Sequence, residues 1–349
     1  MRVALVLGSG GARGWTHIGV IEEIERRGHE IVSVAGASMG SLVGGIYAAG
    51  KLPELHEWAA SLTKSDVRGL LDITIGNPGL IKGTKVLEAL EEITGPVNIE
   101  DLQVPYTAVA VDLLTHREVW FQDGPLYLAI RSSISIPTVF TPVRIGNYLL
   151  TDGGVLNPVP VEPTLAVTSD ATIAVDLFGP AKVPPAEVLK KSLEKEDSLL
   201  SRAIDAAQGS IESLQKTAFG LFFNDAEDEE EEKPITMEDV LPQLRRSTAE
   251  ESTPVPTEVK APSISEIQDS KDAEKKMRLP DSLGMMQVAD MALKSMQEII
   301  GRYRAAANPV TATVVFPRDL VGDLDYHRAA ELIELGRTEA VKVLDAAGL

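Results

Sequence analysis

Apolar and polar residues alternate along the first 50 residues in short blocks of two different periods. Continuous apolar runs at 2–7 and 31–35 predict buried strands, because a strand covered on both faces carries apolar side chains on both. The intervening residues 16–27 have apolar positions at helical spacing, and 38–49 turn helical again with small residues that allow close packing. Strand, helix, strand and helix in this order predict a parallel sheet with helices on its faces.

Further elements follow the same two periods along the rest of the chain. Helices are predicted over six segments, the fourth and fifth of them long and amphipathic, namely 53–62, 84–93, 125–133, 183–223, 283–307 and 325–346. Strands are predicted as a pair, a hairpin around Gly146-Asn147 and two buried runs, namely 106–111 with 118–121, 143–150, and 171–177 with 311–316. The expected fold class is α/β, with three layers and a parallel-rich central sheet between the helices.

Composition changes sharply between the two long amphipathic stretches. Residues 225–274 hold 16 acidic and 5 basic residues, a net charge of −11, and five prolines interrupt them. Such a segment buries too little apolar surface to fold, so we predict a disordered insertion. A solvated linker is the simpler interpretation, and an acidic segment that binds a partner is the alternative. The rest of the chain, 1–224 and 275–349, is expected to form a single domain.

The overall composition excludes several classes of protein. The 33 basic and 52 acidic residues give a net charge of −19, which opposes nucleic-acid binding through a general field. The absence of cysteine excludes disulfides, a thiol nucleophile and cysteine-based metal sites. No stretch approaches the ~20 apolar residues of a membrane-spanning helix, and Val3–Leu7 is too short for the apolar core of a signal peptide. We therefore expect a cytoplasmic protein that touches the inner membrane face only peripherally.

The first candidate for chemistry is Gly36-Ala37-Ser38-Met39-Gly40, a G-x-S-x-G sequence between a predicted strand and a predicted helix. A nucleophile elbow requires this context. Small flanking residues permit a sharp turn that lifts the Ser38 hydroxyl off the sheet, where the positive end of the next helix points at it. The alternative is an ordinary strand-to-helix turn with Ser38 as the N-cap. The pentapeptide by itself does not distinguish the two.

The second candidate is the glycine-rich segment 8–14, GSGGARG, directly after the first strand. Its glycines let backbone N–H groups converge on one point, either on a dinucleotide or on an oxyanion. The dinucleotide pattern G-x-G-x-x-G fails because position 13 is Arg, and no acidic residue ends the second strand. A Walker A sequence is also missing. We therefore favour an oxyanion hole over a nucleotide site.

The third candidate is Asp152-Gly153-Gly154, which we expect on a tight, exposed turn. Alone it would be an ordinary turn aspartate. Together with a serine elbow and a nest of N–H donors, it supplies the parts that acyl transfer needs. Of the five histidines, only His327 follows Asp152 in the order of a Ser–acid–His hydrolase, and it lies where the polar first turn of a surface helix is predicted. No histidine cluster has metal-ligand spacing.

These three motifs in this order resemble those of the patatin-like phospholipases. The segments 131–142 and 150–160 resemble the bacterial branch of that family in particular. The resemblance is strong over about 1–180, weaker over the last 70 residues, and absent over 225–280. Ser9 stands where many members have Gly, and we expect it to shape the turn rather than to donate to the oxyanion.

The resemblance implies a patatin-like α/β/α hydrolase domain made of 1–224 and 275–349, and a Ser–Asp dyad in place of a triad. Ser38 would be the nucleophile and Asp152 its general base. The resemblance also implies an oxyanion hole made by the backbone N–H groups around Gly10, Gly11 and Ala12, with the positive charge of Arg13 nearby. The glycines of the two turns that carry Ser38 and Asp152 are Gly36, Gly40, Gly153 and Gly154. The implied reaction is hydrolysis of carboxylic esters of phospholipids or lysophospholipids, with no cofactor and no metal.

Two alternatives remain at this point. One is an acyl-binding or regulatory protein that keeps the fold with little activity, and the other is a histidine-dependent hydrolase that uses His327. For access to lipid, we expect weak peripheral membrane contact through Phe219, Phe222 and Phe223, carried on a flap of the two long helical stretches. The Met residues of the second stretch we expect mainly to fill the core between the two: Met285, Met286, Met291 and Met296.

Overall fold

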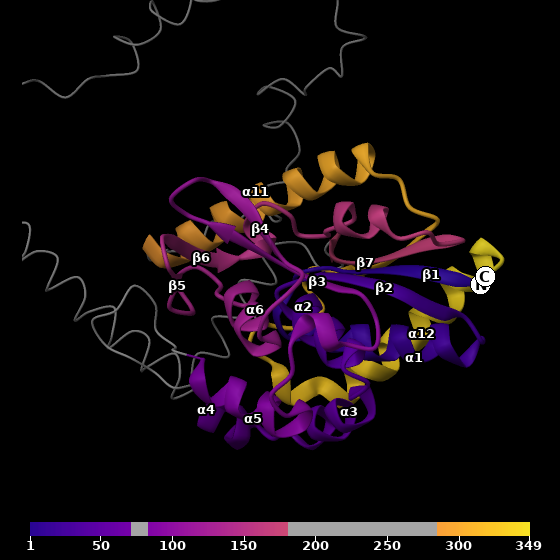
Figure 1. Ribbon diagram of the computed structural model, residues 1–349, viewed down its shortest axis with the longest axis horizontal. Coiled ribbons are helices and arrows are strands. Elements are labelled where there is room, and N and C mark those ends of the chain that lie inside the picture. Colours follow the sequence, from indigo (N-terminus) through magenta and orange to yellow (C-terminus); the bar gives the residue numbers. More distant parts are fainter. Residues whose placement is uncertain (71–82, 181–284) are drawn as a thin grey trace, which may run out of the picture. The chain divides into compact units, whose positions relative to one another are not determined.

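The structure, a computed structural model, describes residues 1–70, 83–180 and 285–349, all of which belong to one compact unit (Figure 1). The helix predicted at 183–223, the acidic segment 225–274 and the Phe-rich residues 219–223 lie outside the described residues.

The described residues form one eight-stranded sheet. Its strands are β1 (Arg2–Leu7), β2 (Glu30–Ala37), β3 (Tyr106–Asp112), β4 (Arg117–Phe121), β5 (Val143–Ile145), β6 (Tyr148–Asp152), β7 (Ala171–Gly179) and β8 (Ala312–Pro317). The order is β5-β6-β3-β2-β1-β7-β8, and β4 also pairs with β3. The neighbouring strands β3, β2, β1, β7 and β8 are parallel to one another, whereas β4, β5 and β6 pair in antiparallel fashion.

Helices cover both faces of this sheet. They are α1 (Thr16–Arg26), α2 (Met39–Ala48), α3 (Leu52–Ser61), α4 (Lys64–Leu70), α5 (Thr84–Thr94), α6 (Leu126–Ser133), α11 (Met285–Ala307) and α12 (Ala329–Ala347). Figure 1 shows α11 on one side of the sheet and α1, α2 and α12 on the other. The strand β1 is therefore buried on both faces from Val3 to Leu7, as its continuous apolar run predicts. The α/β class with a mostly parallel sheet is confirmed.

Three details differ from the sequence prediction. The helix α4 was not predicted, although Thr63 and Asp66 cap each other's backbone N–H groups in a T-x-x-D capping box that the sequence displays. The last helix begins at Ala329, after a separate 3-10 turn η5 (Tyr326–Arg328). Third, Met291 and Met296 of α11 are 44% and 56% exposed, whereas the prediction has them in a core with the stretch 183–223, which lies outside the described residues.

The helices α1 and α12 touch backbone to backbone. A Cβ atom on Gly336 would lie 2.1 Å from the carbonyl oxygen of Thr16, and one on Gly19 would lie 1.9 Å from that of Ile333. Both distances are far below van der Waals contact, so any side chain at either position forces the helices apart. This crossing matters for the site, because α1 follows the glycine-rich segment directly.

We expect Gly336→Ala to lower the free energy of unfolding by about 1–3 kcal/mol or more, as overpacking does in a close contact. Gly69→Ala is the matched control, since the methyl group it adds to α4 meets nothing within 4 Å. Because alanine is more favourable than glycine in a helix by up to about 1 kcal/mol, Gly69→Ala should leave the free energy of unfolding unchanged or raise it slightly. Urea unfolding followed by circular dichroism measures both variants. Equal midpoints for the two would contradict the close crossing of α1 and α12.

Candidate active site

Ser38 lies between the end of β2 and the start of α2 in a conformation that L-residues rarely adopt, with φ 54° and ψ −125°. The turn closes only because its flanking positions lack side chains. A Cβ atom on Gly40 would lie 2.0 Å from the Leu7 carbonyl oxygen, and one on Gly36 would lie 2.3 Å from that of Gly40. The Ser38 side chain makes no capping hydrogen bond to α2. This geometry is that of an elbow and not of an ordinary N-cap.

Hydrogen bonds from neighbouring elements fix the strained backbone of Ser38. Its N–H donates to Ser133 Oγ at 3.0 Å, and Ser133 Oγ donates in turn to the Val109 carbonyl oxygen at 2.6 Å. On the other side, Ser41 Oγ donates to the Ser38 carbonyl oxygen at 2.7 Å. The elbow is thereby connected to α6 and β3, so its position does not depend on α2 alone.

Asp152 ends β6, opposite Ala110 of β3. The expectation of an exposed turn is wrong, since Asp152 is only 2% exposed. The reason is Gly153, which packs so closely on β3 that a Cβ atom there would lie 2.1 Å from the Val109 carbonyl oxygen. One carboxylate oxygen, Oδ1, accepts the Gly154 N–H at 2.7 Å. The other, Oδ2, is buried and has no hydrogen-bond partner among the described residues.

Burial raises the pKa of Asp152 to about 7, although the Ser38 hydroxyl group and the hydrogen bond from the Gly154 N–H partly oppose this rise. The two residues meet at one atom of β3: Ser133 Oγ, which accepts the Ser38 N–H, donates to the Val109 carbonyl oxygen, and Gly153 packs against the same oxygen. Residues separated by more than a hundred positions in the sequence thus meet at one point. A carboxyl group with a pKa near neutrality, next to a hydroxyl group, is able to accept a proton from it at physiological pH.

The glycine-rich segment presents two free donors. The N–H groups of Gly10 and Gly11 have no hydrogen-bond partner within the part of the chain that the structure describes, whereas Ser9 N–H donates to the Pro158 carbonyl oxygen at 2.8 Å. Ala12 N–H donates to the Asp323 carbonyl oxygen at 2.9 Å. Of the three donors expected for an oxyanion, two are therefore available and the third is already bonded.

Arg13 supports this segment from behind. Its guanidinium group is buried, and its Nε donates to the Gly10 carbonyl oxygen at 2.9 Å. Nη2 forms an ion pair with Asp323 Oδ1 at 2.8 Å, and Nη1 donates to the Arg318 carbonyl oxygen. With its donors used in this way, Arg13 holds the loop backbone in place.

The turn after Asp152 packs directly on the glycine-rich segment. A Cβ atom on Gly154 would lie 2.5 Å from Ser9 Oγ. The Ser9 side chain therefore lies at the contact between the two turns.

Sequence reasoning missed two residues at the site. His17 is fully buried on α1, its Nε2 lies 2.8 Å from the Gly8 carbonyl oxygen, and burial lowers its pKa to about 4. Its neutral ring therefore supports the first glycine of the loop. The pKa of Tyr326 is raised by burial and then by the charges of Asp323 and Asp152. The nearest sequence signal was the L-D-Y-H segment that also contains His327.

Tyr326 belongs to a row of aromatic rings that includes Trp15, the residue directly after the glycine-rich segment. Its ring lies edge-on to Trp15 with a centroid distance of 6.1 Å, and Trp15 lies edge-on to Trp58 at 6.2 Å. The indole Nε1 of Trp15 donates to the Tyr326 carbonyl oxygen at 3.1 Å. His327, half-buried in the same 3-10 turn, follows Tyr326 directly.

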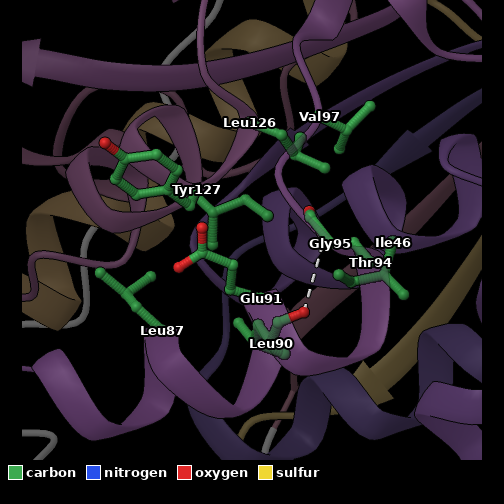
Figure 2. Close-up of a pocket in the computed structure, with 10 residues that line it drawn as sticks. Ile46, Leu87, Leu90, Glu91, Thr94, Gly95, Val97, Leu126 and Tyr127 are labelled. Carbon is green, nitrogen blue, oxygen red and sulfur yellow. Dashed lines mark hydrogen bonds between the residues drawn. The ribbon is translucent and has the colours of Figure 1, made fainter.

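A small apolar cavity lies elsewhere, between α2, α5 and α6 (Figure 2). It is lined by side chains such as Ile46, Leu90 and Leu126, and neither Ser38 nor Asp152 borders it. Its volume of about 10 Å³ is room for about one water molecule. The cavity is too small for an acyl chain.

No group of three or more His, Cys, Asp or Glu side chains among the described residues is arranged to hold a metal ion. Within the same residues, no helix combines the length and the apolar character that crossing a bilayer requires.

Comparison with known proteins identifies the family. The family model of patatin-like phospholipase matches residues 5–165. An uncharacterized NTE family protein of Mycobacterium tuberculosis is 39% identical over 345 residues, which are 99% of this chain and 92% of that protein. Patatin-like phospholipase domain-containing protein 6 of Homo sapiens is 32% identical over 182 residues, 50% of this chain but only 13% of that protein. VipD from Legionella pneumophila overlaps 59% of this chain and 55% of its own at a TM-score of 0.30 and 15% identity, too low a similarity to bear on the fold. The mycobacterial match covers nearly the whole chain, and the family model matches within it. The chain therefore belongs to the patatin-like phospholipase family, a family of lipid acyl hydrolases.

Proposed function

We propose that this protein is a serine hydrolase that cleaves carboxylic ester bonds of phospholipids or lysophospholipids, with Ser38 as nucleophile and Asp152 as general base. The observation that supports this most strongly is the closeness of a strained serine to a buried carboxyl group whose pKa is about 7. A serine hydroxyl needs a base to attack an ester. Burial raises the pKa of a carboxyl group, so a desolvated carboxylate is basic enough to take the place of an imidazole.

In the first half of the proposed reaction, Ser38 Oγ attacks the ester carbonyl carbon while its proton moves to Asp152. The negative charge on the carbonyl oxygen is stabilised by the N–H groups of Gly10 and Gly11, each of which could contribute about 3 kcal/mol to the transition state. The proton then passes from Asp152 to the departing alcohol. In the second half, Asp152 takes a proton from water as the water oxygen attacks the acyl carbon; the bond from that carbon to Ser38 Oγ then breaks, Asp152 returns the proton to Ser38 Oγ, and the fatty acid is released.

An acyl-binding or regulatory role is the second candidate. One observation favours this role: the Ala12 N–H, one of the three expected oxyanion donors, already donates to the Asp323 carbonyl oxygen. Turnover of an ester by the purified protein separates the two candidates, since a binding protein would retain the acyl ester intact.

Replacement of the nucleophile tests the proposal first. We expect Ser38→Ala to reduce hydrolysis of a short-chain nitrophenyl ester about a million-fold, the loss typical of a nucleophile knockout. Labelling by a fluorophosphonate probe should disappear with it. Ser61→Ala is the matched control, because Ser61 is an exposed serine at the end of α3. If the Ser38→Ala protein kept more than a few per cent of the wild-type rate, roughly 10⁴-fold above that expectation, Ser38 would not be the nucleophile.

The pH dependence tests the base. Asp152 must be ionised to accept a proton, and its pKa is about 7, so kcat/KM should fall as the pH drops below 7 and level off above it. An acidic limb with an apparent pKa near 4, the ordinary value for aspartate, would be inconsistent with a buried base. Asp152→Asn should abolish the limb together with the activity, whereas His327→Ala should preserve both. A dead His327→Ala protein with unchanged thermal unfolding would favour a triad.

Contact with lipid remains a proposal that rests on the sequence. We propose weak, mainly apolar peripheral contact through Phe219, Phe222 and Phe223, because the net charge of −19 opposes binding to anionic membranes. Replacing Phe222 and Phe223 by Ser should then reduce hydrolysis of vesicle phospholipid but not of a soluble short-chain ester. Equal losses on both substrates, with a lowered melting temperature, would assign these residues to a folded core.

A further inference from the structure

The segment between β8 and α12 contacts the glycine-rich loop at consecutive peptide groups. The carbonyl oxygen of Asp323 accepts the Ala12 N–H at 2.9 Å, and its Oδ1 accepts from Arg13 Nη2 at 2.8 Å. Arg13 in turn donates from Nε to the Gly10 carbonyl oxygen at 2.9 Å. One residue, more than 300 positions away in the sequence, is therefore connected to the loop both directly and through Arg13.

These contacts fix the direction in which the Gly11 N–H points. In a trans peptide the C=O and the following N–H lie in one plane and point in opposite directions. Holding the Gly10 carbonyl oxygen on Arg13 therefore directs the Gly11 N–H away from Arg13. Holding the Ala12 N–H on Asp323 fixes the next peptide plane in the same way. Gly11 itself has φ +55°, and a Cβ atom there would lie 2.8 Å from the Asp323 carbonyl oxygen, so the contact also requires glycine.

Two positively charged side chains, Arg13 and Lys294, keep the Asp323 carboxyl group ionised. Burial works against ionisation, but the charges of Arg13 and Lys294 lower the pKa of Asp323 below its ordinary value. Lys294 lies on α11, with its Nζ 2.6 Å from Asp323 Oδ2 and 2.7 Å from Asp290 Oδ2. The carboxylate thus remains a fixed anchor for Arg13 at neutral pH.

We propose that Asp323 is a positioning residue for the oxyanion hole, which orients the Gly11 N–H through Arg13 and through its own carbonyl oxygen. The inference rests on the proposed function, in which Gly10 and Gly11 bind the oxyanion. It assigns a role in the site to a residue well outside residues 5–165, which the family model covers.

The test compares Asp323→Asn with Asp290→Asn. Both substitutions remove one carboxylate partner of Lys294, but only Asp323 also contacts Arg13. We expect Asp323→Asn to lower kcat for a soluble ester roughly 10- to 100-fold, the effect of a slight misplacement at a site. KM should stay within about twofold, because the contact acts in the transition state. Asp290→Asn should leave both constants within about twofold of wild type.

Hydrogen exchange supplies a readout that does not depend on turnover. The amides of residues 8–14 should exchange faster in Asp323→Asn than in the wild type and in Asp290→Asn. Arg13→Gln should lower kcat as well, and the double variant should lose no more than the worse single variant, since both residues act through one ion pair. If Asp323→Asn does not fold, Asp323→Glu, which keeps the charge but displaces it, should show the same lowered kcat and faster exchange.

Unchanged kcat and unchanged exchange in a folded Asp323 variant would overturn the inference, as would losses that multiply in the double variant. A raised KM with unchanged kcat would also overturn it, since that result places Asp323 in substrate binding. If the wild type hydrolyses no ester, the proposed function fails. Exchange at residues 8–14 then still decides whether Asp323 holds the loop.

Discussion

The burial of the Asp152 carboxyl group beside Ser38 is the constraint on which the proposed site depends. An ionised carboxylate in a dry site is costly, and here one of its oxygens has no hydrogen-bond partner among the described residues. The cost appears as a pKa of about 7, and it destabilises the folded state at any pH above the unfolded value. The same cost makes the carboxylate a usable base at neutral pH. Stability and proposed reactivity are thus opposed at a single side chain.

The rest of the structure holds that unfavourable arrangement in place. Ser38 keeps a strained backbone because α6 and β3 hold it through Ser133, and Asp152 is brought inward because Gly153 fits against β3. The backbone of the glycine-rich loop is held by Arg13 at the Gly10 carbonyl oxygen and by His17 at the Gly8 carbonyl oxygen. Apart from Arg13, which belongs to the loop itself, these supports come from different elements of the sheet and its helical layers. A parallel sheet with its loops gathered at one edge is suited to this, since several strand ends reach the same place.

Much of the fold could be predicted from the sequence, because the strands buried on both faces carry unbroken apolar runs. The first four elements and the hairpin at Gly146-Asn147 follow from local pattern alone. The motifs at Ser38 and Asp152 were also visible. The burial of Asp152 was not, since it depends on contact between Gly153 and a strand 40 residues earlier. Likewise, Asp323 and Tyr326 reach the site through tertiary contacts that leave no periodic signal, and the exposed Met291 and Met296 look apolar enough for a core.

A direct titration of the Asp152 carboxyl group would decide whether its burial has the consequence described. The protein would be labelled with ¹³C at aspartate carboxyl carbons, and the Asp152 resonance assigned by its loss in Asp152→Asn. Its chemical shift should then titrate with an apparent pKa near 7 in the folded wild type. Titration at about 4, the value of an exposed aspartate, would show that the carboxyl group is solvated and that Ser38 has no matched base beside it.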